Sequence, residues 1–216
     1  MWKLCVSSML INQQIIKTTG VLDNNLLVFC VLFSPSDSSE VKLDTNTAHR
    51  NLVLSEDNRK VTSVRQKQPY PDHPERFDHW EQILCRDGLT GRCYWEVERK
   101  GGVHIAVTYR GIRRAGGGPD SCFGWNENSW SLICSDEGFS VSHNNIRTAI
   151  PVPSSSNRLA VYLDWPAGSL SFYSVSSDTL IHLHTFTSTF TEPLYPGFRV
   201  WSHGSSVSLL THPVLK

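Results

Sequence analysis

Short apolar runs recur at regular spacing from Leu43 onward, and this spacing constrains the fold more than any other feature of the sequence. Runs of five to eight apolar or alternating residues are separated by clusters of Gly, Pro, Asn, Asp or Ser, which favour turns. The predicted strands are 52–54, 60–64, 82–84, 91–98, 103–109, 130–134, 139–142, 158–164, 169–175, 181–186, 195–200 and 207–210. So many short strands predict an all-β fold, in which two antiparallel sheets pack face to face to bury their apolar faces.

The composition supports a neutral, folded domain. The chain has 20 basic and 20 acidic residues and a formal net charge of zero, so it lacks the cationic excess on which nucleic-acid binding depends. Hydrophobic residues make up 39% of the 216 positions, which argues against disorder. We therefore expect one globular domain that does not bind nucleic acid.

Residues 1–40 differ from the rest of the chain. Their longest apolar run, 26–33, is far shorter than the roughly 20 residues of a membrane-spanning helix, and it begins too late for a usual secretion signal. The sequence SPSDSSE at 34–40 resembles a linker. We expect 1–40 to be a poorly ordered extension and linker, with a cryptic secretion signal as the alternative, and 41–212 to be the folded domain.

Alternation within the segment 93–98 (CYWEVE) predicts which of its side chains are buried. Trp95 and Val97 share one face of the strand, and Glu96 and Glu98 share the other. We expect the two apolar residues in the core and the two carboxylates in solvent.

Two further segments have a predictable local structure. The residues 158–175 contain two alternating runs joined by a turn from Asp164 to Gly168, which indicates a hairpin. The stretch 45–51 (TNTAHRN) has a composition that permits a short helix, capped at its first residue or at the one before it.

The six cysteines contain no CxxC pair, so their spacing gives little support to a structural zinc site. An even number permits disulfides, but a chain of this length can fold without them. We expect free and largely buried thiols.

Five segments follow one another in a distinctive order. They are LDTNTAHRNLVLSEDNRKV at 43–61, GRCYWEVE at 91–98, FGWNENSWSL at 123–132, RLAVYLDWPAGSLSFYSV at 158–175 and EPLYPGF at 192–198. This series resembles the PRY-SPRY domain family, most strongly the fish-type versions on tripartite-motif proteins, NLR-type receptors and stonustoxin-like venom subunits. Trp165 departs from the Tyr or Phe that many members carry. By this resemblance, about 41–90 form the PRY part and about 91–212 the SPRY part.

The resemblance implies a twisted two-sheet sandwich, a concanavalin-like jelly roll with a short helix in the PRY part. Such a domain is a non-catalytic platform that binds a protein ligand and needs no cofactor. Its motif residues are expected to be structural: Leu43, Asp44, Trp95, Glu96, Asn126, Trp130, Leu163, Asp164, Gly168, Phe172, Tyr195 and Pro196.

The parent protein implied by the resemblance is a cytoplasmic innate-immune receptor or a tripartite-motif-like ubiquitin ligase, with this domain at its C-terminus. The alternative is a fragment of a stonustoxin-like secreted lytic subunit. Neither reading places a membrane-spanning segment in this chain.

Aromatic residues in long irregular stretches are the best candidates for contact with a partner, because rigid rings bury area at low entropic cost. The longest such stretch is 66–80, and the second is 135–145. The resemblance adds the strand around 133–135 to the expected binding surface. The candidate contact residues are Tyr70, Phe77, Trp80, Ile133, Ser135 and Phe139.

Two patterns permit catalysis or metal binding. Glu96 and Glu98 lie about 7 Å apart on one strand face, a separation that a glycosidase could use, but solvated carboxylates are far commoner. His182 and His184 could hold a metal with Glu192, Asp178 or His203 as the third ligand, although exposed histidines are the favoured interpretation. We expect neither a catalytic site nor a metal site.

The basic stretch with Arg110, Arg113 and Arg114 could bind phosphate or carboxylate groups. Because the domain is neutral overall, a solvated loop is the favoured interpretation.

Overall fold

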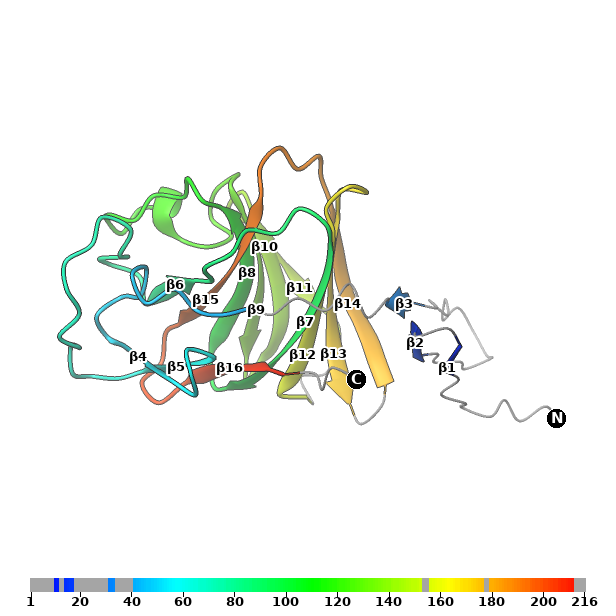
Figure 1. Ribbon diagram of the computed structural model, residues 1–216, viewed down its shortest axis with the longest axis horizontal. Coiled ribbons are helices and arrows are strands. Elements are labelled where there is room, and N and C mark those ends of the chain that lie inside the picture. The colour runs from blue at the N-terminus through cyan, green and yellow to red at the C-terminus, as the bar shows by residue number, and fades with distance from the viewer. Residues whose placement is uncertain are drawn as a thin grey trace.

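Two antiparallel sheets form the body of the protein in the computed structural model, which describes residues 10–11, 14–17, 31–33, 41–152, 156–176 and 179–211 (Figure 1). The first sheet contains β6 (Gln82–Leu84), β8 (Val103–Tyr109), β9 (Ser129–Ser135), β10 (Gly138–His143), β11 (Ile146–Ile150) and β15 (Leu194–Val200). Its six strands have the order β11-β10-β9-β8-β15-β6.

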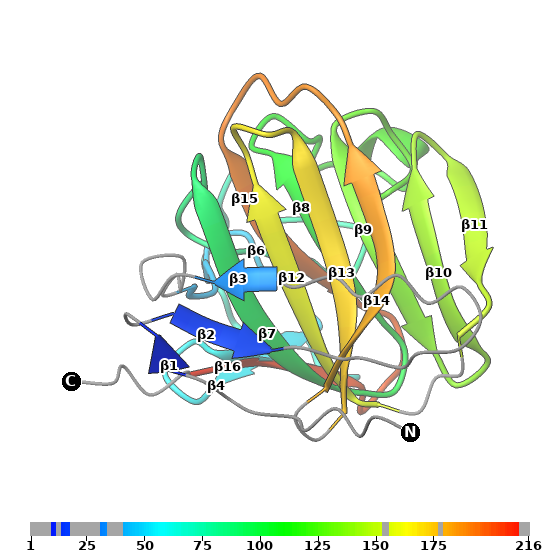
Figure 2. The same ribbon diagram turned by 90° about the vertical axis from the view of Figure 1, so that its right-hand side faces the viewer.

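The second sheet has seven strands. They are β4 (Leu52–Ser55), β5 (Lys60–Ser63), β7 (Arg92–Lys100), β12 (Arg158–Asp164), β13 (Ser169–Ser176), β14 (Thr179–Thr187) and β16 (Ser206–Leu210). Their order is β14-β13-β12-β7-β16-β5-β4, and Figure 2 shows β14, β13, β12 and β7 side by side. The predicted all-β sandwich of two antiparallel sheets is confirmed.

The predicted strands coincide with observed strands to within two residues at either end. One strand of the sandwich, β11, was not predicted, because it lies at the sheet edge and its first four residues are exposed, which removes the apolar alternation. The 158–175 hairpin is also confirmed, with β12 and β13 paired from Arg158↔Val175 to Asp164↔Ser169.

A separate three-stranded sheet consists of β1 (Leu10–Ile11), β2 (Gln14–Lys17) and β3 (Val31–Phe33). The other residues of 1–40 lie outside the described part of the chain. The expectation of a poorly ordered extension and linker therefore stays a prediction.

The main core lies between the two large sheets. The predicted inward residues of β7, Trp95 and Val97, are both buried there. The seven-stranded sheet adds Phe172 from β13, and the six-stranded sheet adds Leu132 from β9 and Phe198 from β15. These large apolar side chains fix the distance between the sheets, and each fully buried one contributes roughly 1.5–3 kcal/mol.

The prediction that Glu96 points into solvent is wrong, because only 1% of this residue is exposed. Its carboxylate accepts hydrogen bonds from the Tyr94 hydroxyl and from Arg158 Nε. Tyr94 packs with Tyr173 in a small cluster that covers this part of the sheet. Burial, and then the hydrogen bond to Glu96, raise the pKa of Tyr94, so its hydroxyl stays a donor. The carboxylate is occupied by structural partners, which gives no support to a catalytic pair with Glu98.

The short helix predicted over 45–51 is also wrong. The backbone there forms a turn at 45–47, in which the Asp44 carbonyl accepts the Thr47 N–H at 3.0 Å and Asp44 Oδ1 accepts the Asn46 N–H at 3.0 Å. Arg76 Nη1 binds the carbonyls of Thr45 and Ala48, which a helix would need for its own ladder. Within the described residues, the helical structure is limited to the 3₁₀ turn η2 (Pro119–Ser121).

The turn from Asp164 to Gly168 closes the β12–β13 hairpin as predicted. Asp164 Oδ1 accepts the Ala167 N–H at 3.0 Å, and Gly168 has a φ of 68°. A Cβ at Gly168 would lie 2.1 Å from the Ser188 carbonyl oxygen, so only glycine fits this position.

Four cysteines lie in the described part of the chain, and all four are free and buried as expected: Cys85, Cys93, Cys122 and Cys134. Cys5 and Cys30 lie outside it. No helix among the described residues is long and apolar enough to span a membrane.

The segment 66–80 covers part of the outer face of the six-stranded sheet. Its Phe77 is 1% exposed and packs with Leu84, Ala106, Ile112 and Phe123 in a second apolar cluster. The rings of Phe77 and Phe123 meet edge to face, with centroids 5.6 Å apart. Phe77 is therefore a core residue, which corrects its assignment as a contact residue.

We predict that Phe77→Ala lowers the free energy of unfolding by about 3 kcal/mol, because it leaves a cavity between the segment and the sheet. Urea denaturation measures this change. Ile146→Ala is the control, because Ile146 is 69% exposed, and its effect should stay within about 0.5 kcal/mol. A Phe77→Ala protein as stable as this control would contradict the assignment.

Candidate functional site

Strand register places a row of side chains across the outer face of the six-stranded sheet. Arg199 on β15 pairs with His104 on β8, His104 pairs with Ile133 on β9, and Ile133 pairs with Ser140 on β10. Directly paired residues point to the same face of a sheet, so these four side chains lie beside one another. Their chain neighbours, such as Ile105 and Leu132, point into the main core.

Three members of this row, His104, Ile133 and Arg199, line a groove with a cavity volume of about 630 Å³. Small side chains from β9 and β10, those of Ser135 and Ser142, also line the groove. The segment 66–80 covers the sheet on the β6 side through Phe77 and leaves this part uncovered.

Tryptophan side chains line the groove. Trp201 is 36% exposed and meets the His104 ring edge to face, with centroids 4.9 Å apart. Trp125 also lines the groove and is supported from behind by Trp80, with ring centroids 5.4 Å apart. The loop that carries Trp125 is fixed by Asn126, whose Nδ2 donates to the carbonyls of Pro119 and Cys122.

The guanidinium of Arg199 lies among these rings, 4.3 Å from the ring centroid of Trp80, 5.8 Å from that of Trp125 and 6.0 Å from that of Trp201. Its Nη1 donates to Cys122 Sγ at 3.2 Å. Burial raises the pKa of the Cys122 thiol to about 11, although Arg199 acts in the opposite direction. The sulfur is therefore an uncharged thiol near pH 7 and does not neutralise Arg199.

His104 is buried at the base of the groove, and its Nδ1 has no hydrogen-bond partner in the described structure. Burial, and then the positive charges of Arg199 and Arg147, lower the pKa of His104 to about 3, against the opposing effect of a hydrogen bond with the Phe123 backbone. The imidazole is thus neutral at physiological pH.

Two of the six predicted contact residues, Ile133 and Ser135, line this groove. Trp80 supports it from behind. Ile133 and Ser135 line the groove together because residues two apart on β9 point to the same face. Their role as contact residues stays a prediction.

Tyr70 and Phe139 do not contribute to the groove. Phe139 is 3% exposed and pairs with Cys134 on the inner face, so it is a core residue and its assignment as a contact residue is corrected. The Tyr70 hydroxyl donates to the Leu52 carbonyl at 2.9 Å, and Arg76 lies 5.0 Å from the Tyr70 ring centroid. Tyr70 therefore fastens the segment 66–80 to β4.

The groove also contains residues that the sequence did not identify. They are His104, Trp125, Arg147, Arg199 and Trp201. Alternation along β8 and β15 could have placed His104 and Arg199 on the outer face. The sequence does not show that these two strands pair with each other, because about 90 residues separate them.

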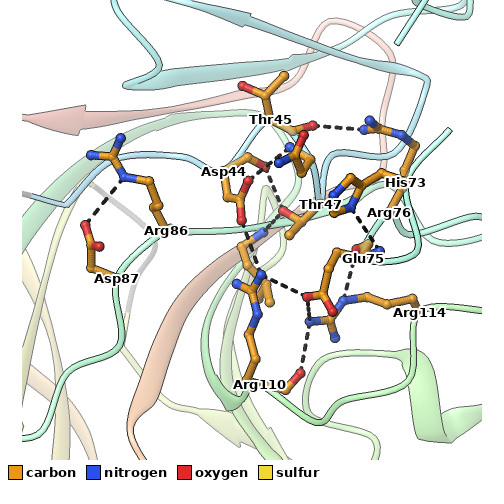
Figure 3. A network of polar contacts seen from close by, with 12 residues as sticks. Asp44, Thr45, Thr47, His73, Glu75, Arg76, Arg86, Asp87, Arg110 and Arg114 are labelled. Carbon is orange, nitrogen blue, oxygen red and sulfur yellow. Dashed lines mark hydrogen bonds and ion pairs between the residues drawn. The ribbon is translucent and has the colours of Figure 1, made fainter. Parts of the chain in front are cut away.

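The predicted basic stretch forms an ion-pair network instead of a free cationic loop (Figure 3). Arg110 Nη2 lies 2.9 Å from Glu75 Oε2 and 3.4 Å from Asp44 Oδ2, and Arg114 Nη2 lies 3.0 Å from the same Glu75 oxygen. Only 9% of the Arg114 side chain is exposed. These two guanidiniums are therefore structural. The third, Arg113, is mostly exposed and pairs with Asp120 at 2.9 Å.

The histidine pair on β14 does not form a metal site with the residues that the structure describes. His182 Nε2 lies 2.8 Å from Thr185 Oγ1, and a bulge opposite β14 shifts the register between His182 and His184. Within the described ranges, no three His, Cys, Asp or Glu side chains are grouped to hold a metal ion. The predicted third ligand Asp178 lies outside those ranges.

A second cavity, of about 450 Å³, lies beside the segment 66–80. Its lining includes Arg50 and Asp72, which form an ion pair with a nitrogen–oxygen distance of 2.5 Å. The charges in this cavity are thus partly satisfied within the chain.

We predict that His104 makes the fold less stable as the pH falls. The unfolded chain protonates this histidine below pH 6.5, whereas the folded chain resists protonation down to about pH 3. Its contribution is complete above pH 6.5 and declines toward pH 3, so between pH 7 and pH 5 the free energy of unfolding should fall by about 2 kcal/mol.

Urea denaturation at both pH values measures this change, with His104→Gln as the comparison. The variant should lose much less stability between pH 7 and pH 5. A residual loss is expected because burial also lowers the pKa values of His49, His182 and His184. Equal losses in the variant and the unmodified protein would contradict the prediction.

Comparison with protein families gives two adjacent matches. Residues 41–89 match PRY, the SPRY-associated domain, and residues 92–212 match the SPRY domain. The chain is 47% identical over 163 residues to Stonustoxin subunit beta from Synanceia horrida, with 74% of this chain and 23% of that protein covered. It is 41% identical over 162 residues to Tripartite motif-containing protein 16 from Mus musculus, with 74% and 29% covered. The chain thus spans about a quarter of the length of these relatives.

Solved structures agree with the fold. The crystal structure of the TRIM65 PSpry domain superposes with a TM-score of 0.75 at 28% sequence identity, covering 82% of this chain and 92% of that one. The stonustoxin structure superposes with a TM-score of 0.74 at 44% identity, covering 80% of this chain and 27% of that one.

Proposed function

This chain belongs to the PRY-SPRY family, and we propose that it is a protein-recognition module whose contact surface is the groove on the six-stranded sheet. The groove has tryptophan side chains from the loops, and strands β8, β9 and β15 of the sheet supply His104, Ile133 and Arg199. We further propose that the parent protein is a cytoplasmic innate-immune receptor or a tripartite-motif-like ubiquitin ligase. The similarity to Tripartite motif-containing protein 16 supports this assignment.

The observation that carries the proposal is the exposed Trp201 beside the apolar Ile133 and the stacked Arg199. Aromatic and arginine side chains dominate the binding energy of protein interfaces, because each buries a large area with few rotatable bonds. SPRY domains are in general binding modules, and we propose no reaction for this one.

A second candidate function is supported by the similarity to venom proteins. The identity to Stonustoxin subunit beta, 47%, exceeds the 41% identity to the tripartite-motif relative. In that case the chain is part of a secreted lytic subunit, and its groove contacts another subunit. The coding sequence upstream of Met1 discriminates between the two functions. A pore-forming region there supports the lytic subunit, whereas RING, coiled-coil or NACHT sequence supports the receptor or ligase.

We predict that Trp201→Ala weakens partner binding by about tenfold or more, because it removes an exposed aromatic anchor from the groove. Ile133→Glu should act in the same direction by placing a charge on the groove floor. The measurement is capture of a partner by the immobilised protein, followed by titration of the purified partner against each variant.

The control is Ile181→Ala, because Ile181 is 38% exposed and lies on β14 of the other sheet. This variant should bind like the unmodified protein. Urea denaturation of all three variants shows whether they are folded. Binding that survives both groove substitutions but is lost with Ile181→Ala would move the contact surface to the seven-stranded sheet.

A further inference from the structure

Two arginines in the groove differ from the other arginines discussed above. Arg110 and Arg114 share Glu75, and Arg158 binds Glu96. Among the residues that the structure describes, neither Arg147 nor Arg199 forms an ion pair with a carboxylate, and both line the groove. The cations available to an external ligand are therefore not those of the basic stretch at 110–114.

Arg199 keeps hydrogen-bond donors free although it is surrounded by aromatic rings. The guanidinium lies over the Trp80 ring, 4.3 Å from its centroid, and this contact with the ring face uses none of its five N–H donors as a hydrogen bond to oxygen or nitrogen. One of these groups donates to Cys122 Sγ, which is an uncharged thiol. The remaining donors and the full positive charge can thus serve a carboxylate.

Arg147 approaches the same place from β11. Its Nε donates to Ser140 Oγ at 2.8 Å, and Ser140 belongs to the row of paired residues that contains Arg199. Its two Nη groups have no partner within the described ranges. Both arginines line the same groove as His104, and the charges of both lower the pKa of this buried histidine.

The groove has the opposite charge at the β9–β10 turn. Asp136 and Glu137 line it there, and they form no ion pair in the described structure. The paired positions Ser135↔Gly138 and Ser142↔Arg147 show that this turn and Arg147 lie at different ends of β10. A polyanion would be repelled at the turn, whereas a single carboxylate near the arginines would not.

From this distribution we propose that the groove binds an extended peptide of the partner protein in which one Asp or Glu side chain pairs with Arg147, while the positive charge of Arg199 attracts the same acidic part of the peptide. A basic or neutral residue a few positions away faces Asp136 and Glu137, and an apolar residue contacts Trp201. This inference rests on the proposed function, because it assumes that the groove is the contact surface.

The test is selection of peptides from a phage-displayed library of random 12-residue sequences on the immobilised chain. The selected peptides should be enriched in Asp or Glu, and their synthetic, C-terminally amidated forms should bind at least tenfold more weakly to Arg147→Gln than to the unmodified chain. Arg113→Gln makes the same change of charge at an exposed arginine outside the groove and should bind like the unmodified chain.

The outcomes separate the two proposals. Two results overturn the acidic-ligand inference and leave the groove as the contact surface. In both, the selected peptides no longer bind the Trp201→Ala variant. In the first, these peptides are not enriched in Asp or Glu; in the second, they bind Arg147→Gln as well as the unmodified chain. Peptides that bind only with a free C-terminal carboxylate overturn the assignment to a side chain. If no selected peptide depends on Trp201, the groove is not the contact surface and both proposals fail.

Discussion

Alternation across the pleat of the six-stranded sheet determines both the core and the groove. On β9, Leu132 points toward the other sheet, whereas Ile133 points outward into the groove. A shift of one residue in β9 relative to β8 would exchange the two faces of β9, exposing Leu132 and turning Ile133 into the core. The forces that stabilise the core therefore also hold the groove residues in position.

The groove also depends on the segment 66–80, which covers another part of the outer face of the six-stranded sheet. Phe77 fastens the segment 66–80 over β6 and β8, and Trp80 from the same segment supports Trp125. Arg76 and the Arg110–Glu75–Arg114 network tie this segment to neighbouring loops by polar contacts. The long irregular stretch is thus a structural cover, and its aromatic side chains act from within the protein.

The sequence predicted what local alternation and turn chemistry control. The strand positions, the buried Trp95 and the turn at Gly168 follow from residues close together in the chain. Prediction from the sequence failed where burial depends on partners that are distant in the chain. Glu96 is buried because Arg158 compensates its charge. Phe77 is buried because its ring packs against that of Phe123. Of the candidate site, Ile133 and Ser135 could be predicted, whereas Arg199 and Trp201 join them only through the pairing of β15 with β8.

Three of the seven tryptophans of the chain lie around one guanidinium in the groove. Indole emission responds to nearby charge and to solvent contact, and two of the seven indoles, those of Trp125 and Trp201, line the proposed contact surface. A ligand that enters the groove changes the surroundings of Trp125 and Trp201 directly. The domain thus carries its own optical reporter of occupancy, and association can be followed without a label.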